Sequence, residues 1–162
     1  MAKKNKPWWI LDDALEDRIQ KKFDHKQVKI DLGAQETAWV DEGIAELIYL
    51  CNAHGIITIM SCECQSTKST HFVNDCAWLM LPAKSAILFM KKLSDGGFKP
   101  KTWQGLPNDI SFPKNYWGCT SDWIPEYNDM ISHFRFPPTH IKRCVKALKN
   151  YEKKMKEKRA NP

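Results

Sequence analysis

The densest group of side chains able to take part in chemistry lies in one polar segment, residues 61–71. Ser61 brings a hydroxyl group, Cys62 a thiol and Glu63 a carboxylate. Further hydroxyl groups and basic side chains follow at Ser66, Thr67, Lys68, Ser69, Thr70 and His71. Such groups can hold a phosphate or a sugar through hydrogen bonds and charge. We therefore expect a ligand-binding loop here, against the alternative of an ordinary polar surface loop. Neither a Walker loop nor a Gly-x-Gly-x-x-Gly motif is present.

Thiol chemistry is a second possibility in the same segment. Cys62, Cys64, His71 and Cys76 are ligand types that bind Zn²⁺ tetrahedrally, although their spacing is not the paired Cys-x-x-Cys pattern. Cys62 with His71 or His54 would also have the components of an activated nucleophile. Against both alternatives we expect unliganded thiols, no metal and no catalytic residue. With no export signal, the six cysteines are expected to stay reduced in the cytoplasm.

A strand and a helix must position this loop. The β-branched run at residues 56–60 predicts a central strand, with the Ser61 loop at its carboxyl end, where α/β sheets bind ligands. A helix is predicted before it, over residues 42–54, with Asp41 as its cap and Gly55 as its left-handed stop. Its buried stripe comprises Ile44, Leu47, Ile48 and Cys51. Asp41 and Glu42 are therefore expected to lie beside the loop, in one cleft.

The remaining elements follow from periodicity and from glycine and proline. Four-residue spacing predicts a helix over residues 11–23, and alternation predicts a strand over 28–32. A second apolar run covers 76–81, and Pro82 opens a helix over 83–93 that Gly96 and Gly97 end. Irregular strands and aromatic loops follow, with a strand near 130–136. The last helix is capped by Thr139, and its apolar face comprises Ile141, Cys144, Val145, Leu148, Tyr151 and Met155.

Charge is concentrated at the two ends of the chain. Three lysines lie in residues 1–7, and nine basic residues lie between Lys142 and Arg159. The stretch from 7 to 136 holds 13 basic and 17 acidic residues, so the net charge of +6 belongs to the ends. A solvated, solubilising helix end is the simpler interpretation, and weak contact of this helix with nucleic acid is the alternative. The aromatics between Trp103 and Tyr127 are expected to form core, against the alternative of stacking bases.

One segment resembles a known family. Residues 40–62 begin with Val-Asp-Glu-Gly-Ile and end with Thr-Ile-Met-Ser-Cys. This segment resembles the N-terminal part of the wybutosine-synthesis tRNA methyltransferases. Trp78 fits a strand that follows the segment in that family. Small bacterial and phage proteins with a Ser-Cys-Glu-Gly loop look similar. This chain departs at Cys64, where those proteins have Gly, and at Gln65, where the methyltransferases have Arg. The resemblance implies a local helix–strand–loop shape, and methyl transfer from S-adenosylmethionine only as an alternative.

Taken together, the residues predict an α/β or α+β fold in a single domain over 1–162. We expect a small mixed sheet with packed helices, a basic N-terminal tail over 1–7 and a basic C-terminal helix with an exposed end over 151–162. No stretch is apolar for long enough to cross a membrane. The predicted function is binding of a nucleotide or nucleic-acid-like ligand, without a cofactor. The alternatives are the methyltransferase-like enzyme and a protein–protein module such as a phage inhibitor. The predicted ligand-binding residues are Asp41, Glu42, Ser61, Cys62, Glu63, Ser66, Lys68, His71 and Trp78.

Overall fold

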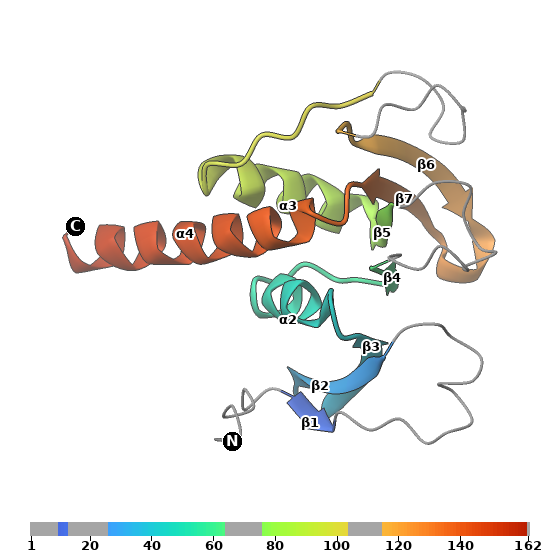
Figure 1. Cartoon of the computed structure of the whole chain (residues 1–162), viewed down its shortest axis with the longest axis horizontal. Helices are drawn as coiled ribbons and strands as arrows, with labels where there is room; N and C mark the ends of the chain where they lie inside the picture. The colour runs from blue at the N-terminus through green and yellow to red at the C-terminus, as the bar shows by residue number, and fades with distance from the viewer. Residues whose placement is uncertain (1–9, 13–25, 64–75, 104–114, 162) are drawn as a thin grey trace.

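A computed structural model describes residues 10–12, 26–63, 76–103 and 115–161 of the protein. The described residues form two antiparallel sheets and three α-helices. In Figure 1 the first sheet lies below α2, α4 and α3 lie side by side above α2, and the second sheet lies to the right of the helices. The predicted α+β class is confirmed, with two antiparallel sheets in place of one mixed sheet.

The first sheet contains β1 (Ile10–Asp12), β2 (Gln27–Gly33) and β3 (Glu36–Asp41), in that order. The predicted strand over 28–32 is confirmed as β2, and it turns into β3 through three residues with positive φ, Gly33, Ala34 and Gln35. The predicted helix over 11–23 is wrong at its start, because β1 pairs with β2 there. Most of that helix, residues 13–23, lies outside the described residues.

Helix α2 (Ala45–Ala53) confirms the predicted helix and its buried stripe. Gly55 follows it with φ +72°, which confirms the left-handed stop. The prediction of Asp41 as its cap is wrong, because Ile44 holds that position without a side-chain bond. Asp41 is instead the last residue of β3, paired with Gln27.

The second sheet contains β4 (Met60–Cys62), β5 (Ala77–Pro82), β7 (Asp129–Phe136) and β6 (Gly118–Ile124), in that order. The central strand predicted over 56–60 is wrong, because only Met60 of that run lies in a strand, and β4 lies at the edge of this sheet. The side chain of Ile57 is 62% exposed. The strand predicted near 130–136 is confirmed as β7, which pairs with β6 across the short helix η1 (Pro125–Tyr127).

Helix α3 (Ala83–Asp95) begins after Pro82 and is followed by Gly96 and Gly97, as the sequence predicts. Helix α4 (His140–Ala160) begins after Thr139, which makes no side-chain cap bond. Four residues of its predicted apolar face are buried, whereas Tyr151 and Met155 are only half-buried. From Lys156 to Ala160 every residue of α4 is exposed, so the end of this helix projects beyond the body (Figure 1). No described helix is both long enough and apolar enough to cross a membrane.

Among the described residues, one hydrophobic core links both sheets and helices α2, α3 and α4. In the part of the core between α3 and the second sheet, Trp117 is 1% exposed. Its ring stacks on that of Phe136 at a centroid distance of 4.4 Å. Three more rings surround it at 6.0–6.3 Å, those of Phe89, Phe98 and Phe134. Trp117 thus belongs to the core, whereas Trp123, in β6, is 56% exposed.

His140, at the start of α4, connects this core to the surface. Its Nδ1 accepts a hydrogen bond of 3.0 Å from Nε1 of Trp117, and its Nε2 lies 3.3 Å from Nη1 of Arg143. Burial, and secondly the guanidinium of Arg143, lowers the pKa of His140 below its ordinary value of 6.5. The neutral imidazole therefore fits this position, because protonation would place a donor against the indole N–H of Trp117.

This geometry predicts a loss of stability in acid. Because the pKa is lower in the folded state, the contribution of His140 is full above pH 6.5 and is lost as the pH falls through its folded pKa. His140→Gln keeps an acceptor for Trp117 but does not titrate. Urea unfolding at pH 7.5 and pH 5 should show a smaller acid-induced loss in this variant than in the wild type. Equal losses in the two proteins would contradict the assignment.

Candidate functional site

Asp41 lies at the centre of the predicted cleft, but its carboxylate already has two partners. Its Oδ1 accepts a hydrogen bond of 3.2 Å from Nε2 of Gln27, and its Oδ2 accepts one of 3.1 Å from the backbone N–H of Glu63. The residue is 4% exposed. A buried carboxylate needs such donors, since burial without them is costly. Asp41 therefore fastens the end of β4 to the end of β3.

Glu42 and Glu63 lie on either side of this junction. Glu42 is exposed and forms an ion pair of 3.0 Å with Lys26. The Glu63 carboxylate lies directly over Gly43, where an added Cβ atom would be 1.5 Å from Oε2. A side chain at position 43 would require this carboxylate, the end of a flexible side chain, to move. The structure thus brings Asp41 and Glu63 together, and Glu42 follows Asp41 in the chain.

The other described residues of the predicted site point in two directions. Cys62 pairs with Trp78, and Trp78 pairs with Arg135, so these three form one row across the second sheet. Ser61 pairs with the buried Leu79 and lies on the opposite face of β4, because side chains alternate along a strand. Ser66, Lys68 and His71 lie outside the described residues.

The zinc alternative depends on Cys64 and His71, which lie outside the described ranges, as does the pairing of Cys62 with His71. His54, the other candidate base for Cys62, follows α2 and lines the pocket described below. Of the other two cysteines in the zinc alternative, Cys62 is half-buried and Cys76 is buried. Cys51, Cys119 and Cys144 are free thiols. The described ranges contain no group of three or more histidine, cysteine or acidic side chains placed to hold a metal ion.

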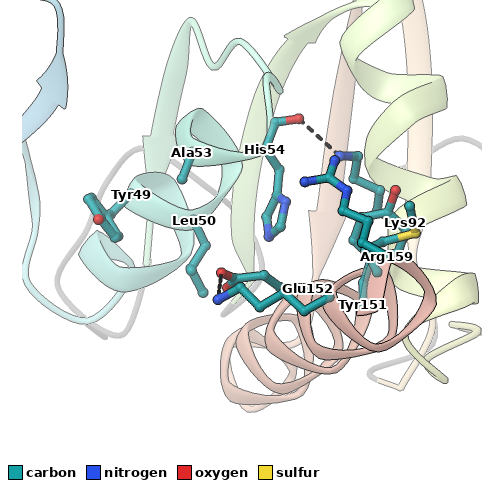
Figure 2. A pocket seen from close by; sticks show the side chains of 10 residues that line it. Tyr49, Leu50, Ala53, His54, Lys92, Tyr151, Glu152 and Arg159 are labelled. Atoms are coloured by element: carbon teal, nitrogen blue, oxygen red, sulfur yellow. Dashed lines mark hydrogen bonds and ion pairs between the residues drawn. The ribbon is translucent and has the colours of Figure 1, made fainter. Parts of the chain in front are cut away.

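A pocket of about 430 Å³ lies elsewhere, between α2, α3 and α4 (Figure 2). The His54 ring points from the end of α2 toward α4, and Lys92 reaches in from α3 (Figure 2). The lining residues come from all three helices and comprise Tyr49, Leu50, Ala53, His54, Lys92, Tyr151, Glu152, Met155, Lys156 and Arg159.

One hydrogen bond and one aromatic contact hold Lys92 in place at one end of this pocket. Its Nζ donates to the backbone oxygen of His54 at 3.1 Å and lies 4.7 Å from the centroid of the Tyr151 ring. The His54 and Tyr151 rings meet edge to face, with centroids 5.7 Å apart. This cation is thus fixed by two contacts, one to a carbonyl group and one to an aromatic face.

Cations outnumber carboxylates in the lining. Lys92, Lys156 and Arg159 face one carboxylate, that of Glu152, which Lys156 pairs at 2.7 Å. The Lys156 ammonium lowers the pKa of Glu152, so this carboxylate is charged at pH 7. Within the described part of the chain, Arg159 makes no ion pair. Its guanidinium is therefore the side chain best able to accept a new anion.

Two of the three ionisable rings in the lining, those of His54 and Tyr49, are neutral near pH 7. Burial, and then Lys92, lowers the pKa of His54 below 6.5, with Glu152 and the backbone of Leu148 acting in the opposite direction. Burial, with the carboxylates of Asp31 and Glu152, raises the pKa of Tyr49 above 10.0. The pocket therefore offers two uncharged hydrogen-bonding rings beside fixed positive charge.

Sequence reasoning did not find this pocket, because its lining residues are spread over about a hundred positions and meet only after folding. Two signals were present: the density of basic residues in α4, and Tyr151 and Met155, which continue its apolar face past the last buried residue, Leu148. Where the apolar stripe of a helix extends beyond the core, its side chains stay half-exposed and can line a pocket. Comparison of the chain with protein-family models, with curated proteins and with solved structures found no match.

Proposed function

We propose that the protein binds a nucleotide or a nucleic-acid-like ligand, and that the ligand occupies the pocket between α2, α3 and α4. The observation that supports this most is the set of three cations beside two tyrosine rings and a histidine in one pocket. Cationic side chains, arginine above all, bind phosphate groups, and aromatic rings stack on bases. A volume of about 430 Å³ is within the range of small-molecule sites.

Electrostatics favour a phosphate-bearing ligand over S-adenosylmethionine. Both adenosine monophosphate and S-adenosylmethionine contain adenosine, but the first carries a phosphate and the second a sulfonium cation. Lys92, Lys156 and Arg159 attract the phosphate and repel the sulfonium. The pair of ligands is therefore a matched test of the binding proposal against the methyltransferase-like alternative.

Calorimetric titration at low salt and pH 7.5 tests the proposal. We expect adenosine monophosphate to bind more tightly than adenosine or S-adenosylmethionine. Arg159→Gln should weaken its binding about tenfold, because a charge-assisted hydrogen bond is lost. Lys142→Gln removes the same charge from the other end of α4 and should change the affinity less than twofold.

Two results would refute this proposal. One is tighter binding of S-adenosylmethionine than of the monophosphate. The other is an equal effect of Arg159→Gln and Lys142→Gln, which would show that only net charge matters. The loop of residues 61–71 stays the alternative position for the ligand that the sequence predicts.

A further inference from the structure

Lysines also gather on the surface next to the pocket, where the projecting end of α4 passes the end of α3. Three lysines surround a single carboxylate there, that of Asp95. Lys91 pairs with it at 2.7 Å, and Lys154 and Lys158 both lower its pKa. Lys154 also donates to the backbone oxygen of Asp95 at 2.7 Å. One carboxylate cannot neutralise three ammonium groups, so this cluster is positive.

The cluster and the pocket lie on adjacent faces of the same two helices. Lys92 of the pocket follows Lys91 of the cluster, and Arg159 of the pocket follows Lys158 of the cluster. An α-helix turns by about 100° per residue, so the two side chains of each pair point to adjacent faces and not to the same face. Basic side chains thus line the pocket and also gather on the adjacent face, whereas the chain between 7 and 136 carries 17 acidic against 13 basic residues.

We infer that the ligand is a single strand of nucleic acid, with one nucleotide in the pocket and the next phosphates on the cluster of Lys91, Lys154 and Lys158. This inference rests on the proposed function and extends it. A single phosphate needs no cations outside the pocket, so the cluster indicates a ligand with several phosphates. A duplex does not fit, because its stacked and paired bases cannot enter a pocket without being flipped out.

Fluorescence anisotropy with a labelled heptanucleotide tests the inference. Three probes are compared: single-stranded RNA, single-stranded DNA and a duplex of the same sequence. At low salt we expect at least one single strand to bind at least tenfold more tightly than adenosine monophosphate and than the duplex. A difference between the RNA and DNA strands identifies which nucleic acid the site prefers.

Salt dependence reports how many phosphates are contacted. Each phosphate contact to a single strand contributes about −0.7 to the slope of log K against log salt. The variant with Lys154→Gln and Lys158→Gln should therefore have a slope less steep by about 1.4, with binding of adenosine monophosphate changed less than twofold. The control with Lys142→Gln and Lys146→Gln has the same net charge and should keep the wild-type slope.

The outcomes separate this inference from the proposed function. If adenosine monophosphate binds in the pocket but the heptanucleotide binds no more tightly, the inference of a single-stranded ligand is wrong, whereas the proposed nucleotide site is supported. Equal affinities for the duplex and the single strands would also contradict this inference. Equal salt-dependence slopes in the two double variants would contradict it as well. If Arg159→Gln leaves both the monophosphate and the heptanucleotide unaffected, both proposals fail.

Discussion

Replacing Trp117 by alanine is expected to lower the free energy of unfolding by about 3–5 kcal/mol. The side chain is 1% exposed and is surrounded by four phenylalanine rings. Its removal leaves a large cavity and also removes the indole N–H that donates a hydrogen bond to Nδ1 of His140. Urea unfolding, followed by far-ultraviolet circular dichroism, measures the loss.

Trp123→Ala is the matched control, since it makes the same chemical change on β6 at a side chain that is 56% exposed. Surface substitutions usually change stability by less than about 0.5 kcal/mol, so this variant should unfold close to the wild type. If the two variants lost equal stability, the placement of Trp117 in the core would be wrong. If Trp117→Ala does not fold, Trp117→Phe, which keeps a ring, should fold with an intermediate stability.

Gly96→Ala is expected to have the second-largest effect, a loss of about 3 kcal/mol, at the upper end of what overpacking costs. A Cβ atom at this position would lie 2.0 Å from the backbone oxygen of Ala147 in α4. Backbone cannot rotate away as a side chain can, so α3 and α4 must separate. Since both helices line the pocket, binding of adenosine monophosphate should weaken as well.

Gly97→Ala is the control for this substitution. Gly97 has a φ of +94°, but no atom would come within 4 Å of its added Cβ. Its cost is therefore backbone strain alone, about 1–2 kcal/mol, without displacement of α4. Chemical unfolding of the two variants side by side should rank Gly96→Ala as the less stable. The reverse order would show that α3 and α4 do not pack this closely.

Local signals in the sequence predicted the elements whose burial follows their own periodicity. The stripe from Ile44 to Cys51 is buried in α2 because four apolar side chains at helical spacing must face one neighbour. Pro82 and Gly97, which has a φ of +94°, bound α3 through backbone chemistry alone. These features need no knowledge of the rest of the chain.

The wrong predictions arose where distant partners override local preference. The β-branched run at 56–60 has strand propensity, yet the backbone N–H of Ile57 donates to Oγ of Ser85 and that of Ile59 to the oxygen of Met80. Asp41 has the chemistry of a helix cap, yet Gln27 and Glu63 use its carboxylate. Neither partner can be identified from neighbouring residues.

Part of the candidate site could likewise be predicted from the sequence, and part could not. Asp41 and Glu63 were predicted to meet, since a helix start and a strand end enclose them, and they do. The pocket was not predicted, because its shape depends on how α2, α3 and α4 cross. Charge density in α4 indicated that an anionic partner was possible, but packing alone decides where a cavity forms beside it.

A nuclear magnetic resonance titration of the ¹⁵N-labelled protein with adenosine monophosphate tests the central claim most directly, since it reports where the ligand binds. We predict the largest shift changes at the backbone amides of Tyr49, His54, Tyr151 and Arg159, around the pocket. Little change is expected at Asp41 and Glu63. Shift changes concentrated at Asp41, Glu63 and the segment 61–71, with the pocket amides unmoved, would contradict the account and place the ligand at the loop instead.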